Sequence, residues 1–185
     1  MRRFSPLLAL VLVALCSLVG TGLAGGHARP KAAPTAHAAI NPGHSISLGY
    51  RTLSHSCRRG RLPDRRCSPG AVFSAANKRM ICVRGYSSKV RNVSTSLKNR
   101  VYAEYGVTHH SRSTYEVDHI VPLEGGGSNA IENLYPQPAY PKPGFHQKDK
   151  LENEMRSRIC YRGANLRSTQ RSIASNWVSL YNRWF

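Results

Sequence analysis

The segment YEVDHIVPLEGGGSNAIEN, residues 115–133, constrains the fold of this chain more than any other stretch. Branched apolar residues surround an Asp-His pair, Asp118-His119, and favour a short strand that Pro122 ends. Three consecutive glycines, residues 125–127, allow the chain to reverse before a second short strand near residues 134–135. Because a helical stretch follows, the segment predicts two strands and a helix, a ββα unit.

Apolar spacing predicts three helices. Ser94 is placed to cap the first helix, and Gly106 is placed to end it in a left-handed conformation. The second helix is expected after Gly144, where apolar residues recur at helical spacing, and the third from Leu166 onward. The fold class predicted from these elements is α+β, with the small ββα unit inside a mainly helical single domain.

Three other segments lack a helical pattern. The apolar run Met80–Val83 is short and favours a strand that ends at Gly85. Residues 136–143 contain four prolines and are predicted to be irregular. The arginine-rich segment Cys57–Gly70 has neither a helical nor an alternating period, so it is expected to be a loop.

The N-terminus has the order of a secretory signal. Arg2 and Arg3 precede an apolar run over residues 7–19, and small residues follow, with cleavage expected after Ala24 or Ala38. The run is too short for a comfortable membrane span, although an uncleaved anchor is the alternative. We therefore expect an exported protein without stable membrane insertion. The expected division is a signal and linker over residues 1–38, a leader over 39–56 and a folded domain over 57–185.

The chain is strongly basic. Its 27 Lys and Arg residues against nine Asp and Glu residues give a net charge of +18. Removal of residues 1–38 takes away four basic residues and no acidic one, which leaves +14. Such a charge favours polyanionic partners, nucleic acid above all, although a solvated basic surface is the simpler alternative.

Cysteine usage fits an oxidising compartment. Without Cys16 in the signal, four cysteines remain, an even number in an exported chain. Of the three possible connectivities we expect Cys57-Cys67 as a local staple and Cys82-Cys160 as a long-range one. A zinc site built from the four cysteines is the alternative, but no CxxC spacing occurs.

The motif can now be compared with a known family. Asp118-His119 with Pro122-Leu123, followed by Gly126, Asn129 and Asn133-Leu134, resembles the HNH (His-Asn-His, ββα-metal) endonucleases. The resemblance continues through Pro136-Gln137, His146-Gln147-Lys148-Asp149, Glu152, Cys160, Gly163, Leu166, Gln170 and Trp177, as in secreted bacterial proteins that carry this domain. It implies a nuclease domain whose core motif spans residues 115–153.

Phosphodiester hydrolysis requires a base for the attacking water and a positive charge beside the phosphate. The resemblance implies His119 as the general base and Asp118 as a metal ligand. It also places Asn133 as the residue that ties the loop between the strands and helps to orient the base. The second metal ligand is expected on the helix, with His146 first and Glu152 or Asp149 as alternatives, because the spacing here departs from that of the simplest family members.

The cofactor expected for this ligand set is one divalent cation, with Mg²⁺, Mn²⁺, Ni²⁺ and Zn²⁺ all compatible. Four cations of the helix are expected to contact phosphate without reading sequence. They are Lys148, Lys150, Arg156 and Arg158.

The predicted function is a secreted, metal-dependent endonuclease of low sequence specificity that acts on DNA, with RNA left open. The alternative is a non-catalytic basic protein that binds DNA or the cell envelope on the same fold. An immunity or inhibitor protein is conceivable as a partner, but nothing in the sequence indicates one.

Overall fold

The computed structural model describes residues 40–185, so the predicted signal segment lies outside the described residues. Within this range the chain has a mixed α+β fold, with helices and two small antiparallel sheets. In chain order the elements are β1 (Ser45–Ser47), β2 (Ala71–Phe73), α1 (Lys78–Ile81), α2 (Tyr86–Val90), α3 (Thr95–Glu104), β3 (Tyr115–His119), the 3-10 turns η1 (Leu123–Gly125) and η2 (Ile131–Asn133), β4 (Leu134–Pro138), α4 (Phe145–Tyr161) and α5 (Leu166–Trp184). In residues 40–185, no helix is both long and apolar enough to cross a membrane.

The first sheet begins inside the predicted leader. β1 pairs with β2 so that Ser45 lies opposite Phe73 and Ser47 opposite Ala71. The three residues of β2 are buried, whereas those of β1 are exposed. Part of residues 39–56 therefore belongs to the fold, because it supplies the hydrogen-bonding partner of a buried strand.

The second sheet is the predicted hairpin. β3 and β4 are antiparallel, with Asp118 opposite Tyr135 and His119 opposite Leu134. The expectation that residues 136–143 are irregular was wrong for the first three, since β4 runs through Pro136 and Pro138. The two prolines are two residues apart on an edge strand, so both occupy positions whose N–H would point away from β3. The N–H that proline lacks is therefore not needed for a hydrogen bond between the strands.

Asn133 ties the loop between the two strands. Its Oδ1 accepts hydrogen bonds from the backbone N–H of Val121 (2.9 Å) and of Ala71 (3.2 Å). Its Nδ2 donates to the carbonyl oxygens of Val121 (2.9 Å) and Ser128 (2.8 Å). A side chain on Gly127 would overlap the Val121 carbonyl, so this closely packed loop requires glycine there.

The run Met80–Val83 is not the strand that its composition predicts. Asn77 caps a short helix, α1, by accepting the backbone N–H of Met80 at 3.0 Å. The helix buries Ile81 completely. A cap and one anchoring side chain thus outweigh the strand preference of four apolar residues.

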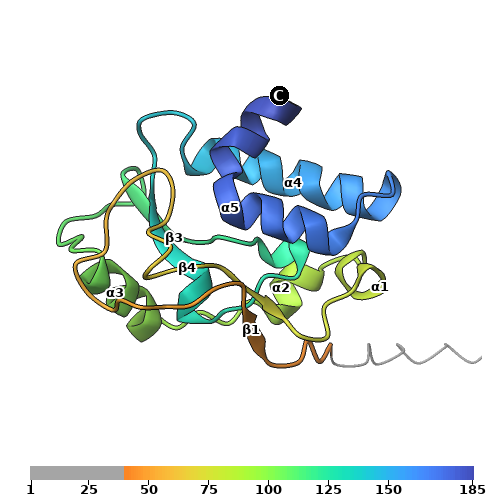
Figure 1. The fold of residues 1–185 in the computed structure, drawn as a ribbon, viewed down its shortest axis with the longest axis horizontal. Coiled ribbons are helices and arrows are strands. Elements are labelled where there is room, and N and C mark those ends of the chain that lie inside the picture. Colours follow the sequence, from red (N-terminus) through yellow and green to blue (C-terminus); the bar gives the residue numbers. More distant parts are fainter. Residues whose placement is uncertain (1–39) are drawn as a thin grey trace, which may run out of the picture. The chain divides into compact units, whose positions relative to one another are not determined.

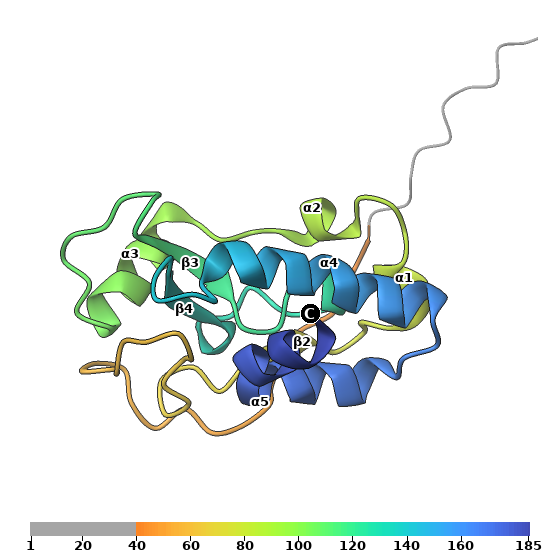
Figure 2. The ribbon, with the colours of Figure 1, turned by 90° about the horizontal axis from the view of Figure 1, so that it is seen from above.

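The three predicted helices are present. Ser94 caps α3 through Leu97 N–H at 3.2 Å, and Gly106 beyond its end has a φ of 62°. α4 and α5 run side by side, and α3 packs against the β3–β4 hairpin (Figures 1 and 2). The largest fully buried core side chains include Ile81, Ile120, Leu134, Tyr135, Leu151, Met155, Ile159, Ile173 and Trp177.

Both predicted disulfides are confirmed. Cys57-Cys67 closes a loop with a sequence separation of 10, and Cys82-Cys160 joins residues 78 apart. The long-range bond connects the residue after α1 to α4. Cys57–Gly70 contains neither helix nor strand, as expected.

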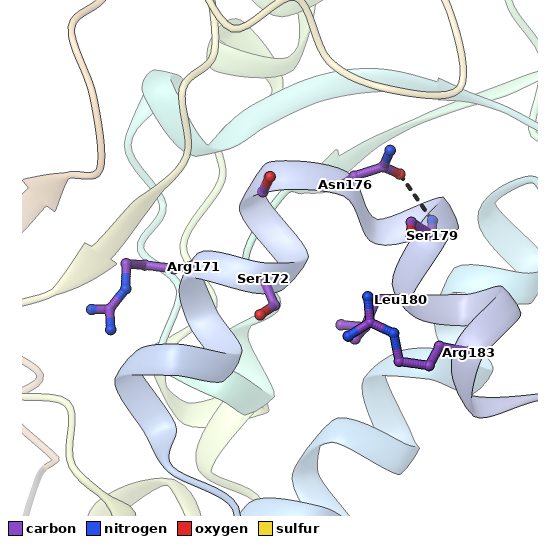
Figure 3. A pocket seen from close by; sticks show the side chains of 7 residues that line it. Arg171, Ser172, Asn176, Ser179, Leu180 and Arg183 are labelled. Carbon is purple, nitrogen blue, oxygen red and sulfur yellow. Dashed lines mark hydrogen bonds between the residues drawn. The ribbon is translucent and has the colours of Figure 1, made fainter.

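α5 is broken at Asn176, whose φ of −161° and ψ of 88° are not helical. The Asn176 side chain caps the second half of the helix by accepting the backbone N–H of Ser179 at 2.9 Å (Figure 3). The break borders a hollow of about 310 Å³ along the exposed side of α5.

Candidate functional site

A cleft of about 560 Å³ lies over β3, and α3 and α4 contribute to its walls. β3 supplies Glu116 and Asp118, while α4 supplies Asp149 and Glu152. Only nine acidic residues occur in the whole chain, and four of them line this one cleft. This gathering of carboxylates in a very basic protein marks the cleft as a candidate site.

Cationic side chains line the same cleft. Arg91, Lys98 and Arg112 come from three separate segments, beside Tyr102 and Tyr115. The cleft therefore presents carboxylates and cations together. The cations can bind an anionic group, and the carboxylates can bind a metal cation.

The carboxylates change one another's protonation. Burial, with the nearby charges of Asp118 and Asp149, raises the pKa of Glu116 to about 7. Burial and the Asp118 carboxylate also raise the pKa of Asp149. Burial is the main cause of both shifts, and the neighbouring carboxylates add to it, so a cation bound among these groups would favour their charged forms.

Lys148 crosses from α4 to the end of β3 and is fully buried. Its ammonium donates to Asp118 Oδ2 (2.6 Å), to the backbone carbonyl of His119 (2.7 Å) and to Glu152 Oε1. Burial would lower the pKa of Lys148, but the Asp118 and Glu152 carboxylates outweigh it and raise the value. All three donors of the ammonium are used, so the predicted phosphate contact by Lys148 does not fit this conformation.

His119 is held by Asn129, a residue of the loop between the strands. His119 Nε2 lies 3.2 Å from Asn129 Oδ1. Asn129 Nδ2 donates to the Val90 carbonyl at 2.7 Å, and its Oδ1 also accepts the backbone N–H of Asn92 at 3.2 Å. With the amide oxygen fixed on the histidine side, Nε2 must carry the proton, which leaves Nδ1 as the basic nitrogen of the neutral ring.

The environment keeps this ring neutral. Burial lowers the pKa of His119 to about 4, although the Asp118 carboxylate and the bond to Asn129 oppose the shift. The residue is only 2% exposed and lies behind the cleft lining. Asp118 lines the cleft and His119 does not, as expected for adjacent strand residues that point to opposite faces.

Asn133 was predicted both to tie the loop and to help orient the base. Its four side-chain hydrogen bonds all go to the backbone of the loop and of β2, whereas Asn129 makes the contact with the imidazole. Asn133 therefore acts on His119 through the position of the strand end. The two roles are divided between two asparagines.

The predicted metal ligands are only partly brought together. Asp118 lines the cleft with Asp149 and Glu152, the two alternatives, whereas His146 is exposed and lies beside Phe145, with 4.3 Å between ring centroids. Among the described residues, no three or more His, Cys, Asp or Glu side chains are grouped to hold a metal ion. The donor chemistry still fits a hard divalent cation, because each carboxylate oxygen of Asp118 accepts one hydrogen bond and retains a lone pair.

The other predicted phosphate contacts lie outside the cleft lining. Arg156 donates to the carbonyl of Cys82 at 3.2 Å, and Arg158 pairs with Glu154 at 2.7 Å while covering the Trp184 ring. Lys150 is exposed. Arg156 and Arg158 thus contact other groups of the fold, whereas Lys150 has no ion pair or hydrogen bond within residues 40–185, because residues along a helix face different directions.

Five charged or amide residues that line or support the cleft were not predicted from the sequence. Glu116 could have been found, because it is two residues before Asp118 and shares its strand face. Asn129 was part of the family pattern but carried no assigned role. Arg91, Lys98 and Arg112 leave no local signal, since they meet only when α3 packs against the hairpin.

No known protein family matches the chain, and neither a characterised protein nor a solved structure shows significant similarity to it.

Proposed function

We propose that this protein is a secreted HNH-type endonuclease that hydrolyses phosphodiester bonds of DNA with low sequence specificity. The observation that carries the proposal is the end of β3, where Asp118 enters a charged cleft and His119 is held by Asn129 in the tautomer of a base. The order β3, β4, α4 is the one that the family resemblance implies. RNA remains a second substrate class under the same chemistry.

In this proposal His119 accepts a proton at Nδ1 from the attacking water. Asn129 holds the ring by its other nitrogen, and Lys148 holds both the Asp118 carboxylate and the backbone carbonyl of His119. Arg91, Lys98 and Arg112 would bind the phosphate from the opposite wall of the cleft. Because His119 is buried and does not line the cleft, the proposal requires its ring to become accessible to water from the cleft when substrate binds.

A divalent cation would be held by Asp118 with Asp149, which line the same cleft, rather than by Asp118 with His146. When bound, it would offset the charge that develops on the phosphate and the leaving oxygen. The carboxylate donors favour Mg²⁺ or Mn²⁺ over softer metals.

The test is plasmid cleavage by the oxidised protein, first with EDTA and then with each metal restored singly. We expect cleavage to require a metal and to fall by about 10² to 10⁴-fold in His119→Ala. Asp149→Asn should abolish the metal response, whereas His146→Ala should keep it. His109→Ala, an exposed histidine, is the matched control and should retain full activity.

A second candidate is a binding protein that has the fold without catalysis. The burial of His119 and the saturation of Lys148 beside Asp118 favour this alternative. DNA binding without cleavage under any metal would establish it and overturn the nuclease proposal.

A further inference from the structure

The loop between Cys57 and Cys67, here named the arginine loop, carries five arginines and one acidic residue. Asp64 pairs with Arg66, and Arg61 donates to the carbonyl of Lys142 at 3.1 Å. The side chains of Arg58, Arg59 and Arg65 are exposed and make no ion pair or hydrogen bond with any residue in the described range 40–185. Three positive charges on one small loop thus have no acidic partner among residues 40–185.

The loop is held in one conformation by its buried carboxylate. Asp64 accepts the backbone N–H of Arg58 at 3.0 Å and that of Arg66 at 3.1 Å. Its own carbonyl accepts the N–H of Cys67 at 2.9 Å, and the disulfide closes the loop. The exposed arginines therefore project from a rigid frame, which reduces the entropy lost when they bind a ligand.

The middle of the loop is anchored to the core. The carbonyl oxygen of Arg61 accepts two hydrogen bonds, from Trp177 Nε1 at 2.9 Å and from the Tyr135 hydroxyl at 3.0 Å. Both donors are fully buried side chains. This contact fixes the loop beside α5.

Two hollows continue the basic surface from the loop onto α5. One, of about 350 Å³, lies between Arg61 of the loop and the broken part of α5, and the other is the hollow of about 310 Å³ that Arg171 and Arg183 line (Figure 3). The two share Asn176 and Ser179, so they are contiguous. Their linings consist of arginine, amide, hydroxyl and aliphatic side chains and include no carboxylate.

We propose that the arginine loop and these two hollows form a binding track for the sugar-phosphate backbone of nucleic acid, separate from the cleft over β3. It rests on the proposed function only in taking nucleic acid as the partner. Arg58, Arg59 and Arg65 bind phosphates by charge, and the amide and hydroxyl groups at the break in α5 add hydrogen bonds. The linings of the two hollows contain no aromatic side chain, so the polar groups there suit a sugar-phosphate backbone better than lipid chains.

The test is the salt dependence of binding of the mature protein to a labelled DNA duplex in EDTA, measured by fluorescence anisotropy. The track variant is Arg59→Ala/Arg65→Ala/Arg171→Ala. The control variant, Lys78→Ala/Arg79→Ala/Lys89→Ala, removes the same charge from exposed positions of α1 and α2. All six side chains are exposed, and circular dichroism confirms that each variant is folded.

We expect the slope of log Kd against log salt to fall by about 2 to 3 in the track variant, since each phosphate contact contributes about 0.9. In the control variant the same slope should fall by less than about 1. Equal losses in the two variants, or an unchanged slope in the track variant, would overturn the proposal. Loss of binding to anionic phosphatidylglycerol vesicles with an unchanged DNA slope would identify a membrane surface as the partner and overturn it as well.

The outcomes separate this proposal from the proposed function. A track variant that loses DNA binding, in a protein that cleaves nothing under any metal, supports the track and removes the nuclease. If the protein cleaves DNA and the track variant binds DNA with an unchanged salt dependence, the nuclease proposal stands and the track proposal is overturned. No DNA binding by the unaltered protein removes both.

Discussion

At the level of single residues, Lys148 links α4 to the end of β3. A fully buried ammonium is costly to desolvate, and it is stable here because two carboxylates and one carbonyl accept all its protons. The same contacts fix the position of Asp118. Lys148, which was expected to contact phosphate, thus holds Asp118 in place from inside the fold.

Replacing Lys148 should therefore be severe. Lys148→Met removes the cation but leaves Asp118 and Glu152 partly buried without a partner, which should cost about 3 to 5 kcal/mol of unfolding free energy. Lys150→Met, an exposed position on the same helix, is the control and should change little. Denaturant unfolding measures both, and similar losses in the two variants would contradict the assigned role.

Asp64 should make stability depend on acid. Its pKa lies below its ordinary value of 3.8, above all because Arg66 donates to its carboxylate. A lowered folded pKa means that the stabilisation is complete above about pH 4 and is lost as the pH falls further. Asp64→Asn should be less stable by about 1 to 3 kcal/mol at pH 7, with the difference shrinking at pH 2 to 3. Thermal unfolding across this range checks the prediction, and a constant difference would refute it.

At the level of elements, the disulfides and the hairpin loop set the arrangement around the cleft. Cys82-Cys160 ties α1 to the end of α4, while Asn133 ties the loop that precedes β4. α4 must lie against the hairpin for Lys148 to reach Asp118. The Cys82-Cys160 disulfide therefore holds α4, and the hydrogen bonds of Asn133 hold the hairpin, in the arrangement that forms the cleft.

The two disulfides should differ in how much they stabilise the fold. Loop-closure entropy predicts about 4.5 kcal/mol for Cys82-Cys160 and about 3 kcal/mol for Cys57-Cys67, because the first closes a much longer loop. We expect the variant with alanine at residues 82 and 160 to unfold at lower denaturant than the variant with alanine at 57 and 67. The reverse order would mean that packing of the arginine loop dominates.

At the scale of the whole molecule, charge is distributed unevenly. Four of the nine acidic residues line one cleft, and Asp64, Glu104 and Glu154 are paired with arginines. Most of the 23 basic residues within residues 40–185 therefore have no acidic partner. The folded state contains repulsion that a polyanion or salt would relieve.

This charge balance predicts that salt stabilises the protein. Raising NaCl from a low concentration to about 0.15 M shortens the Debye length to about 8 Å and screens the repulsion between exposed cations. The melting temperature should rise, and an equal concentration of a neutral solute provides the control. A fall in melting temperature would indicate that screened ion pairs outweigh the repulsion.

The sequence by itself determined the α+β class, the hairpin, the three longer helices and both disulfides. The elements follow from local properties, namely strand pattern, helical spacing and the Ser94 cap, and the disulfides follow from an even number of cysteines outside the N-terminal segment. Local pattern failed at Met80–Val83, where the Asn77 cap and the burial of Ile81 overrode strand preference, and at β4, where two prolines fit an edge.

Only the tertiary structure decided which side chains meet at the cleft. Arg91, Lys98 and Arg112 are brought there by packing between distant segments, Lys148 is turned inward, and His146 is left outside. The choice of Asn129 rather than Asn133 as the partner of His119 depends on where the loop folds back. Such contacts join residues far apart in sequence, and their geometry is set by the whole core rather than by any short pattern.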